Sequence, residues 1–73
     1  MLNKTITIYC KEDDNFKIEK VVEKYINRGV RMLDSKDDVI RITFDCSIFK
    51  VSKLRHDIEL LNNIGIKTQI KEA

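Results

Sequence analysis

Few residues of this chain could carry acid–base or nucleophilic chemistry. Its one histidine, His56, lies in the run Arg55-His56-Asp57, which helical spacing places on the polar side of a helix. A general base needs a positioned nucleophile within hydrogen-bond reach and a group that stabilises the developing charge. A helix flank offers neither, so we interpret His56 as a surface residue. We therefore predict that the chain is not an enzyme.

The cysteines could form a disulfide or bind a metal only if the fold brought them together. Cys10 and Cys46 follow no Cys-x-x-Cys spacing, and each is expected at the end of a different strand. The predicted sheet separates these ends by roughly 15 to 20 Å, whereas a disulfide needs α-carbons within about 7 Å. Tetrahedral zinc needs four ligands, which the chain does not group together. We predict free thiols, no metal, no cofactor and a reducing, cytoplasmic setting.

The acidic residues form two groups, residues 12–14 and the set Asp34, Asp37 and Asp38. Neither has the alternating oxygen ligands and the glycine of an EF-hand calcium loop. The first group is typical of a helix N-terminus and the second of a hairpin turn. Gly29 and Gly65 each follow a predicted helix and form no phosphate-binding loop.

Hydrophobic periodicity predicts the elements that position these residues. Alternation with period two predicts strands over residues 5–10, 39–44 and 66–71, with a weaker strand over 30–33. Helical spacing predicts a helix over 16–28, ended by Gly29, and a second helix capped by Ser47 or Ser52. Residues 34–38 are the predicted hairpin turn. The two apolar stripes are Ile18, Val21, Val22 and Tyr25 in the first helix, and Val51, Leu54, Ile58 and Leu61 in the second.

The order of these elements predicts an α+β fold. The chain has 73 residues, which allows a single domain over residues 1–73 and leaves no room for a deep substrate cavity. A β-α-β-β-α-β order gives a four-stranded antiparallel sheet in the order 4-1-3-2, with both helices on one face. This plan resembles the ferredoxin-like sandwich in architecture, and that resemblance implies no function. No apolar run reaches the roughly 18 to 20 residues that would cross a bilayer, so we expect no membrane partner.

Strand parity predicts two unlike sheet faces. The inner face is expected to carry Ile6, Ile8, Ile40, Ile42, Phe44, Ile66 and Ile70. The open face is expected to be basic, with Asp45 at its margin as the only acid. It would carry Thr5, Thr7, Tyr9, Arg31, Leu33, Val39, Arg41, Thr43, Lys67, Gln69 and Lys71.

The open face suggests one possible partner. An RNA or single-stranded DNA could stack on Tyr9 and contact Arg31, Arg41, Lys67 and Lys71 through its phosphates. The third strand has Val39 and Arg41 where a second stacking aromatic would be expected. A solvated sheet face with no ligand explains the same residues.

The second helix has apolar residues on the side away from its core stripe. On a helical wheel Leu60 lies nearly opposite that stripe with Ile64 beside it, and Phe49 joins them if the helix begins at Ser47. Such a cluster suits a protein partner or a second copy of the chain, as do free strand edges. The alternative is that Ile64 packs under the helix end and that Leu60 is exposed on the helical wheel only. We therefore predict a non-catalytic macromolecule-binding module, an adaptor or regulator that contacts protein, with nucleic-acid binding as the alternative function.

Overall fold

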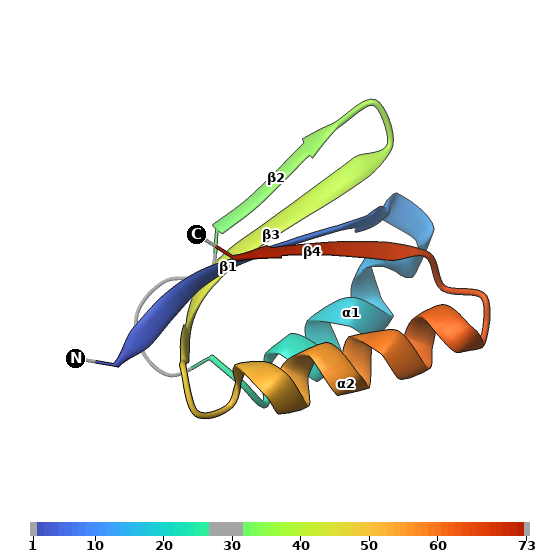
Figure 1. The fold of residues 1–73 in the computed structure, drawn as a ribbon. Coiled ribbons are helices and arrows are strands. Elements are labelled where there is room, and N and C mark those ends of the chain that lie inside the picture. Colours follow the sequence, from blue (N-terminus) through green and yellow to red (C-terminus); the bar gives the residue numbers. More distant parts are fainter. Residues whose placement is uncertain (1, 27–31, 73) are drawn as a thin grey trace.

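The chain forms one sheet covered by two helices. The computed structural model describes residues 2–26 and 32–72. A short 3-10 helix, Glu12–Asp14, precedes the first α-helix. The elements are β1 (Asn3–Lys11), α1 (Asn15–Val22), β2 (Met32–Lys36), β3 (Val39–Ser47), α2 (Val51–Asn63) and β4 (Thr68–Glu72) (Figure 1).

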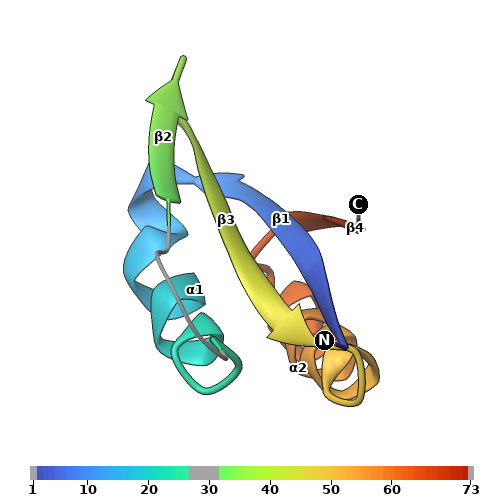
Figure 2. The ribbon, with the colours of Figure 1, turned by 90° about the vertical axis from the view of Figure 1, so that its left-hand side faces the viewer.

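The sheet is antiparallel throughout and has the order β2-β3-β1-β4. This is the predicted order 4-1-3-2 read from the other edge, so the predicted fold class is confirmed. Both helices lie on the same face of the sheet, with α1 and α2 side by side beneath it (Figure 2). The long central strands pair along their whole length, from Asn3 opposite Ser47 to Lys11 opposite Val39. Within residues 2–26 and 32–72, no helix covers the opposite face of the sheet.

The core lies between the sheet and the helices. Of the residues predicted to face inward, Ile6, Ile8, Ile40, Ile42, Phe44 and Ile66 are buried, and Ile70 packs against them partly buried. Cys10 and Cys46 follow the same strand parity and are buried as well. Burying a large apolar side chain contributes about 1.5 to 3 kcal/mol, so these strands and the helix stripes hold the sandwich together.

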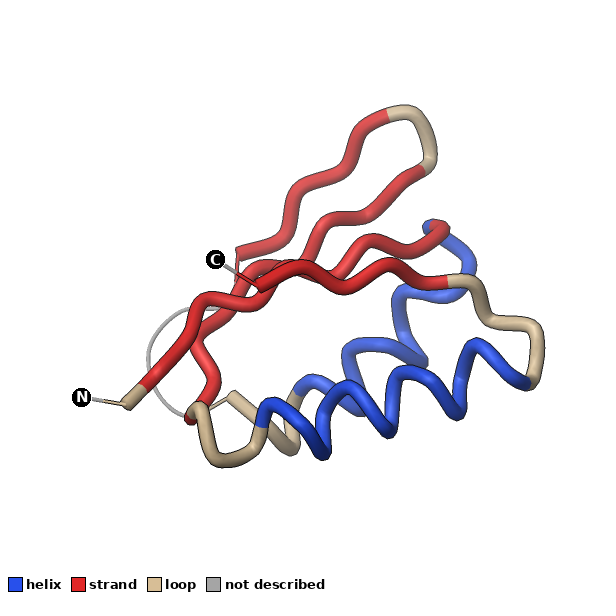
Figure 3. The backbone as a smooth tube through the Cα atoms, in the orientation of Figure 1, coloured by secondary structure: helices blue, strands red, loops and turns tan. Residues whose placement is uncertain are grey.

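The β2–β3 hairpin is tighter than predicted. Its turn is Asp37–Asp38 alone, with φ of 54° and 65°, and Lys36 pairs directly with Val39 (Figure 3). Positive φ at both central residues is the geometry of a type I′ turn, which matches the twist of the flanking strands. Aspartate tolerates this conformation better than most residues do. Because no glycine marks the turn, composition alone suggested a five-residue loop.

The first helix is shorter than the predicted span of 16–28. It ends at Val22, and residues 23–25 continue as a turn in which the Tyr25 amide donates to the Val22 carbonyl at 2.8 Å. Ile26 then leaves the helical path and forms an isolated β-bridge with Cys46. The pairing of Ile26 with Cys46 therefore takes the place of the last predicted turns of the helix. Arg28, Gly29 and Val30 lie outside the described residues.

The second helix begins without the predicted serine cap. Lys50 is the N-cap residue and makes no side-chain capping bond. Ser47 belongs to β3, and its hydroxyl accepts a hydrogen bond from the Phe49 amide at 3.3 Å. Ser52 lies inside the helix. The prediction of a cap at Ser47 or Ser52 was therefore wrong, because the long β3 strand extends to Ser47 and shifts the helix start.

The second helix ends in a Schellman motif. The Gly65 amide donates to the Asn62 carbonyl at 3.1 Å, and the Ile66 amide donates to the Leu61 carbonyl at 3.0 Å. Gly65 has φ of 97°, a conformation that favours glycine. The reversal turns Ile66 into the core and delays β4 until Thr68.

Candidate functional site

The outer face of α2 exposes two large apolar residues. Leu60 is 51% exposed and Ile64, which follows the last helical residue, is 73% exposed. Val51, Leu54 and Ile58 of the same helix are buried. The predicted helix phase is therefore right: Leu60 points away from the core, and Ile64 does not fold under the helix end. Residues four apart on a helix are neighbours, so the two form one apolar pair.

Phe49 is not part of this pair. It precedes α2, whose axis rises about 1.5 Å per residue, so Leu60 lies roughly 15 Å further along. Phe49 is 76% exposed in the β3–α2 loop beside Ile48, and the Ile48 amide donates to the Leu2 carbonyl at 2.9 Å. Leu2 and Ile48 are exposed too. The predicted three-residue surface is thus two surfaces at opposite ends of α2, because the helix begins at Val51 and not at Ser47.

The sheet register places Tyr9 at the centre of the open face. Tyr9 lies opposite Arg41 of β3 and Gln69 of β4. Lys71 approaches the same ring, with its Nζ 5.3 Å from the ring centroid. Lys67 is exposed just before β4 begins. The structure therefore brings four of the five predicted nucleic-acid-binding residues to one region, whereas Arg31 lies outside the described residues.

Strand β2 contributes an acid to this face that strand parity had not predicted. Its register sets Leu33 opposite Ile42, which is buried, and Asp34 opposite Arg41. Arg41 Nη2 and Asp34 Oδ2 form an ion pair at 2.5 Å. The expectation that Asp45 is the only acid of this face was therefore wrong. The expectation that Leu33 shares the open face concerns a side chain that lies outside the described residues. The alternation in residues 30–33 was too weak to set the phase, and β2 in fact runs Met32–Lys36.

The open face nevertheless keeps an excess of cations among the described residues. The register, the exposure and the lining of the hollows beside Tyr9 assign it Lys11, Lys36, Arg41, Lys67 and Lys71 against Asp34, Asp37 and Asp45. Asp45 accepts a hydrogen bond from Thr5 Oγ1 at 3.0 Å. Two open hollows flank Tyr9, one of about 560 Å³ toward β2 and one of about 240 Å³ toward β4. Val39 lines both hollows.

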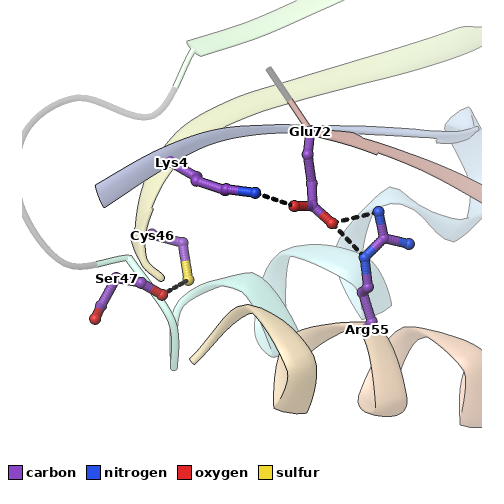
Figure 4. A network of polar contacts seen from close by, with 5 residues as sticks. All are labelled: Lys4, Cys46, Ser47, Arg55 and Glu72. Atoms are coloured by element: carbon purple, nitrogen blue, oxygen red, sulfur yellow. Dashed lines mark hydrogen bonds and ion pairs between the residues drawn. The ribbon is translucent and has the colours of Figure 1, made fainter. Parts of the chain in front are cut away.

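A charged cluster at one sheet edge had no counterpart in the sequence prediction. Glu72 of β4 accepts from Lys4 Nζ of β1 at 3.0 Å and from Arg55 Nε of α2 at 2.5 Å (Figure 4). These two hydrogen bonds lower the pKa of Glu72 below its ordinary value, the Lys4 bond having the larger effect. The cluster ties the two strands to the second helix. Its members are far apart in sequence, so only the fold could reveal it.

The residues that were considered for catalysis or metal binding, His56, Cys10 and Cys46, do not lie together in the structure. His56 is exposed on α2, while its neighbour Asp57 accepts a hydrogen bond from the hydroxyl of Tyr25, in the turn that follows α1. Burial, with a smaller contribution from that bond, raises the pKa of Tyr25 to about 12. Burial also raises the pKa of the Cys10 and Cys46 thiols, which disfavours the reactive thiolate.

Both cysteines are free, as predicted. Cys10 lies opposite Ile40 and Cys46 opposite Lys4, so they occupy opposite ends of the central strand pair. The Cys46 thiol donates to the carbonyl of Ser47 at 3.4 Å (Figure 4). Their positions match the role of small apolar packing residues.

The acidic groups also take structural positions. Residues 12–14 form the 3-10 helix, whose Glu12 amide donates to the Asp38 carbonyl at 3.0 Å. This bond joins the two acidic segments around an open hollow of about 500 Å³. Within residues 2–26 and 32–72, no three histidine, cysteine or acidic side chains are grouped closely enough to hold a metal ion. No helix in these ranges is long and apolar enough to span a membrane.

Comparison with known proteins identifies no relative of this chain. No protein-family model matches the chain, and neither a curated protein nor a solved structure does. Its functional surfaces must therefore be judged from their own chemistry.

Proposed function

We propose that the chain is a non-catalytic binding module that contacts another protein through the outer face of α2. The observation that carries the proposal is the apolar pair Leu60 and Ile64, which is 51% and 73% exposed on a helix whose other large apolar residues are buried or half-buried. Two adjacent aliphatic side chains on a solvated helix stabilise it by only about 0.2 to 0.5 kcal/mol and leave most of their apolar surface in water. A partner that covers them removes that apolar surface from solvent.

The size of the pair favours a partner with its own groove over a second copy of the chain. Stable interfaces bury about 800 Å² per partner, and two aliphatic side chains supply only a part of that area. Two short apolar pairs facing each other would leave most of such an interface to polar groups. A groove that encloses the pair gives each side chain more contact, as in helix-in-groove recognition. The free thiols of Cys10 and Cys46 support a reducing, cytoplasmic setting for this contact.

Site-specific photo-crosslinking tests the proposal. The photoreactive residue benzoylphenylalanine replaces Leu60 in one protein and Lys53, an exposed polar position of the same helix, in a matched control. In lysate of the source cells we expect one discrete protein adduct from position 60, absent from position 53 and lost when Ile64→Lys is added. Equal adducts from both positions, or none from position 60, would refute the proposal. An adduct of twice the chain mass would identify a second copy as the partner.

A further inference from the structure

The open sheet face offers a second surface, independent of α2. Tyr9 lies on the central strand β1 and is partly exposed, with a hollow on either side of it. Val39, at the hairpin end of β3, lines both hollows and is 41% exposed between Lys11 and Lys36. The Tyr9 ring and the Val39 side chain, which share the lining of both hollows, form a flat platform on this face. Such a platform suits a planar ligand group.

The charges around this platform are arranged to attract an anion. Arg41 is neutralised by its ion pair with Asp34, and Asp45 is hydrogen-bonded to Thr5. Asp37 also lines the hollow toward β2, whereas among the described residues no acid lines the hollow toward β4. The positive excess of the face therefore comes from its lysines, which surround the ring on three strands and the segment before β4. They are Lys11, Lys36, Lys67 and Lys71. Four ammonium groups around one ring match a chain of phosphates better than a single acidic group.

The contact between Lys71 and Tyr9 decides between kinds of polyanion. Lys71 Nζ lies over the Tyr9 ring, 5.3 Å from its centroid. A base that stacks on this face displaces the ammonium ion, which is then within reach of the phosphate attached to that base. Single-stranded nucleic acid joins a flat base to a phosphate in every nucleotide, so it fills both positions at once. An acidic polypeptide would satisfy the lysines but leave the ring without a stacking partner. A duplex hides its bases from the ring.

We propose that the open sheet face binds single-stranded nucleic acid, with a base stacked on Tyr9 and phosphates held by the surrounding lysines. If each of the four lysines neutralises one phosphate, the logarithm of the binding constant falls with the logarithm of salt concentration with a slope of about −3. Binding by this surface is tolerant of sequence, because every base presents a flat face to the ring.

Fluorescence anisotropy with labelled oligothymidine and oligouridine of about 12 nucleotides tests the proposal. We expect Tyr9→Leu to weaken binding by about tenfold, since stacking on one aromatic contributes roughly that much, and Tyr9→Phe to preserve it. Lys71→Gln should reduce the salt slope by about 0.7. The matched control Lys53→Gln, which removes the same charge from the exposed side of α2, should leave the slope unchanged. Circular dichroism confirms that each variant is folded.

Several results would overturn the proposal. The first is no binding to either oligonucleotide at about 50 mM salt, where phosphate contacts are strong. The second is equal affinity for polyglutamate, which would make the surface a site for acidic protein. The third is unchanged binding by Tyr9→Leu, or equal salt slopes for Lys71→Gln and Lys53→Gln. None of these results bears on the α2 contact, which crosslinking from position 60 tests separately.

Discussion

Replacing Tyr25 with phenylalanine should destabilise the fold while keeping its shape. The Tyr25 side chain is 5% exposed, and its hydroxyl donates to the Asp57 carboxylate, which links the end of the first helical segment to α2. A hydrogen bond to a charged group contributes about 1.5 to 3 kcal/mol to stability. Asp57 is only half-buried and can recover water after the change. We therefore expect Tyr25→Phe to lower the free energy of unfolding by about 1 to 2 kcal/mol at neutral pH.

The same variant should respond differently to alkaline pH. The folded state raises the pKa of Tyr25 from 10.0 to about 12. A group whose folded pKa is raised adds stability that is fully present below its unfolded pKa and is lost as the pH rises through the folded value. The wild type should therefore lose part of its advantage over Tyr25→Phe between pH 10 and 12. The difference between the two proteins isolates Tyr25 from the buried thiols, which both proteins share.

Urea denaturation followed by circular dichroism measures both effects. Tyr9→Phe is the matched control, because it removes a hydroxyl from the open sheet face and not from the helix contact. A cycle with Asp57→Asn should give a coupling energy of about 1 kcal/mol or more. The reasoning fails if Tyr25→Phe is as stable as Tyr9→Phe at neutral pH, or if the two single variants of the cycle add independently.

Three further predictions concern the surface, the sheet edge and the helix end. Leu60→Glu should change the free energy of unfolding by no more than about 0.5 kcal/mol, whereas Leu54→Glu should unfold the chain. Thermal melts measure both variants, and loss of structure in both would contradict the assigned helix phase. Glu72→Gln should cost about 1 kcal/mol or less at neutral pH. Because the pKa of Glu72 is lowered in the folded state, the difference in stability between the wild type and Glu72→Gln should vanish as the pH falls through that pKa. High salt should reduce the same difference. A stability difference that stays constant from neutral to acid pH in urea titrations would contradict the role of the cluster. Gly65→Ala should lower the free energy of unfolding by about 1 to 2 kcal/mol through the positive φ alone, because an added Cβ meets nothing within 4 Å. Gly65→Asn should lower it less, since asparagine tolerates this conformation better. An alanine variant as stable as the wild type in the same urea titrations would contradict this prediction.

Local periodicity was enough to predict the elements and their inner faces. Ile6 and Ile8 alternate with threonines, and Leu54 and Ile58 recur at helical spacing. Each pattern therefore identifies the face of the strand or helix that is buried on folding. The same wheel placed Leu60 opposite the core stripe, and its 51% exposure in the fold decided between the two alternatives. Such patterns work because burial of apolar groups dominates folding and depends on a repeat within one element.

Sequence periodicity did not predict which residues of β2 share the open sheet face, nor where α1 ends. The phase of β2 depends on how it pairs with β3, and the pairing of Asp34 with Arg41 depends in turn on a type I′ turn without glycine. The end of α1 depends on Ile26, which pairs with Cys46 from a distant part of the chain. In each case a contact between segments competes with a local preference worth only a fraction of a kcal/mol per residue.

The sequence by itself determined the α+β class, the strand order and the core, because these follow from apolar repeats and from the rules of strand connection. Only the tertiary structure decided which surface residues meet. It separated Phe49 from Leu60, neutralised Arg41 with Asp34, placed Lys71 over Tyr9 and joined Lys4, Arg55 and Glu72. The physical reason is that polar and exposed side chains carry no strong periodic signal of their own. Their neighbours are set by backbone register and by where each helix begins, and a shift of one residue in either changes every partner.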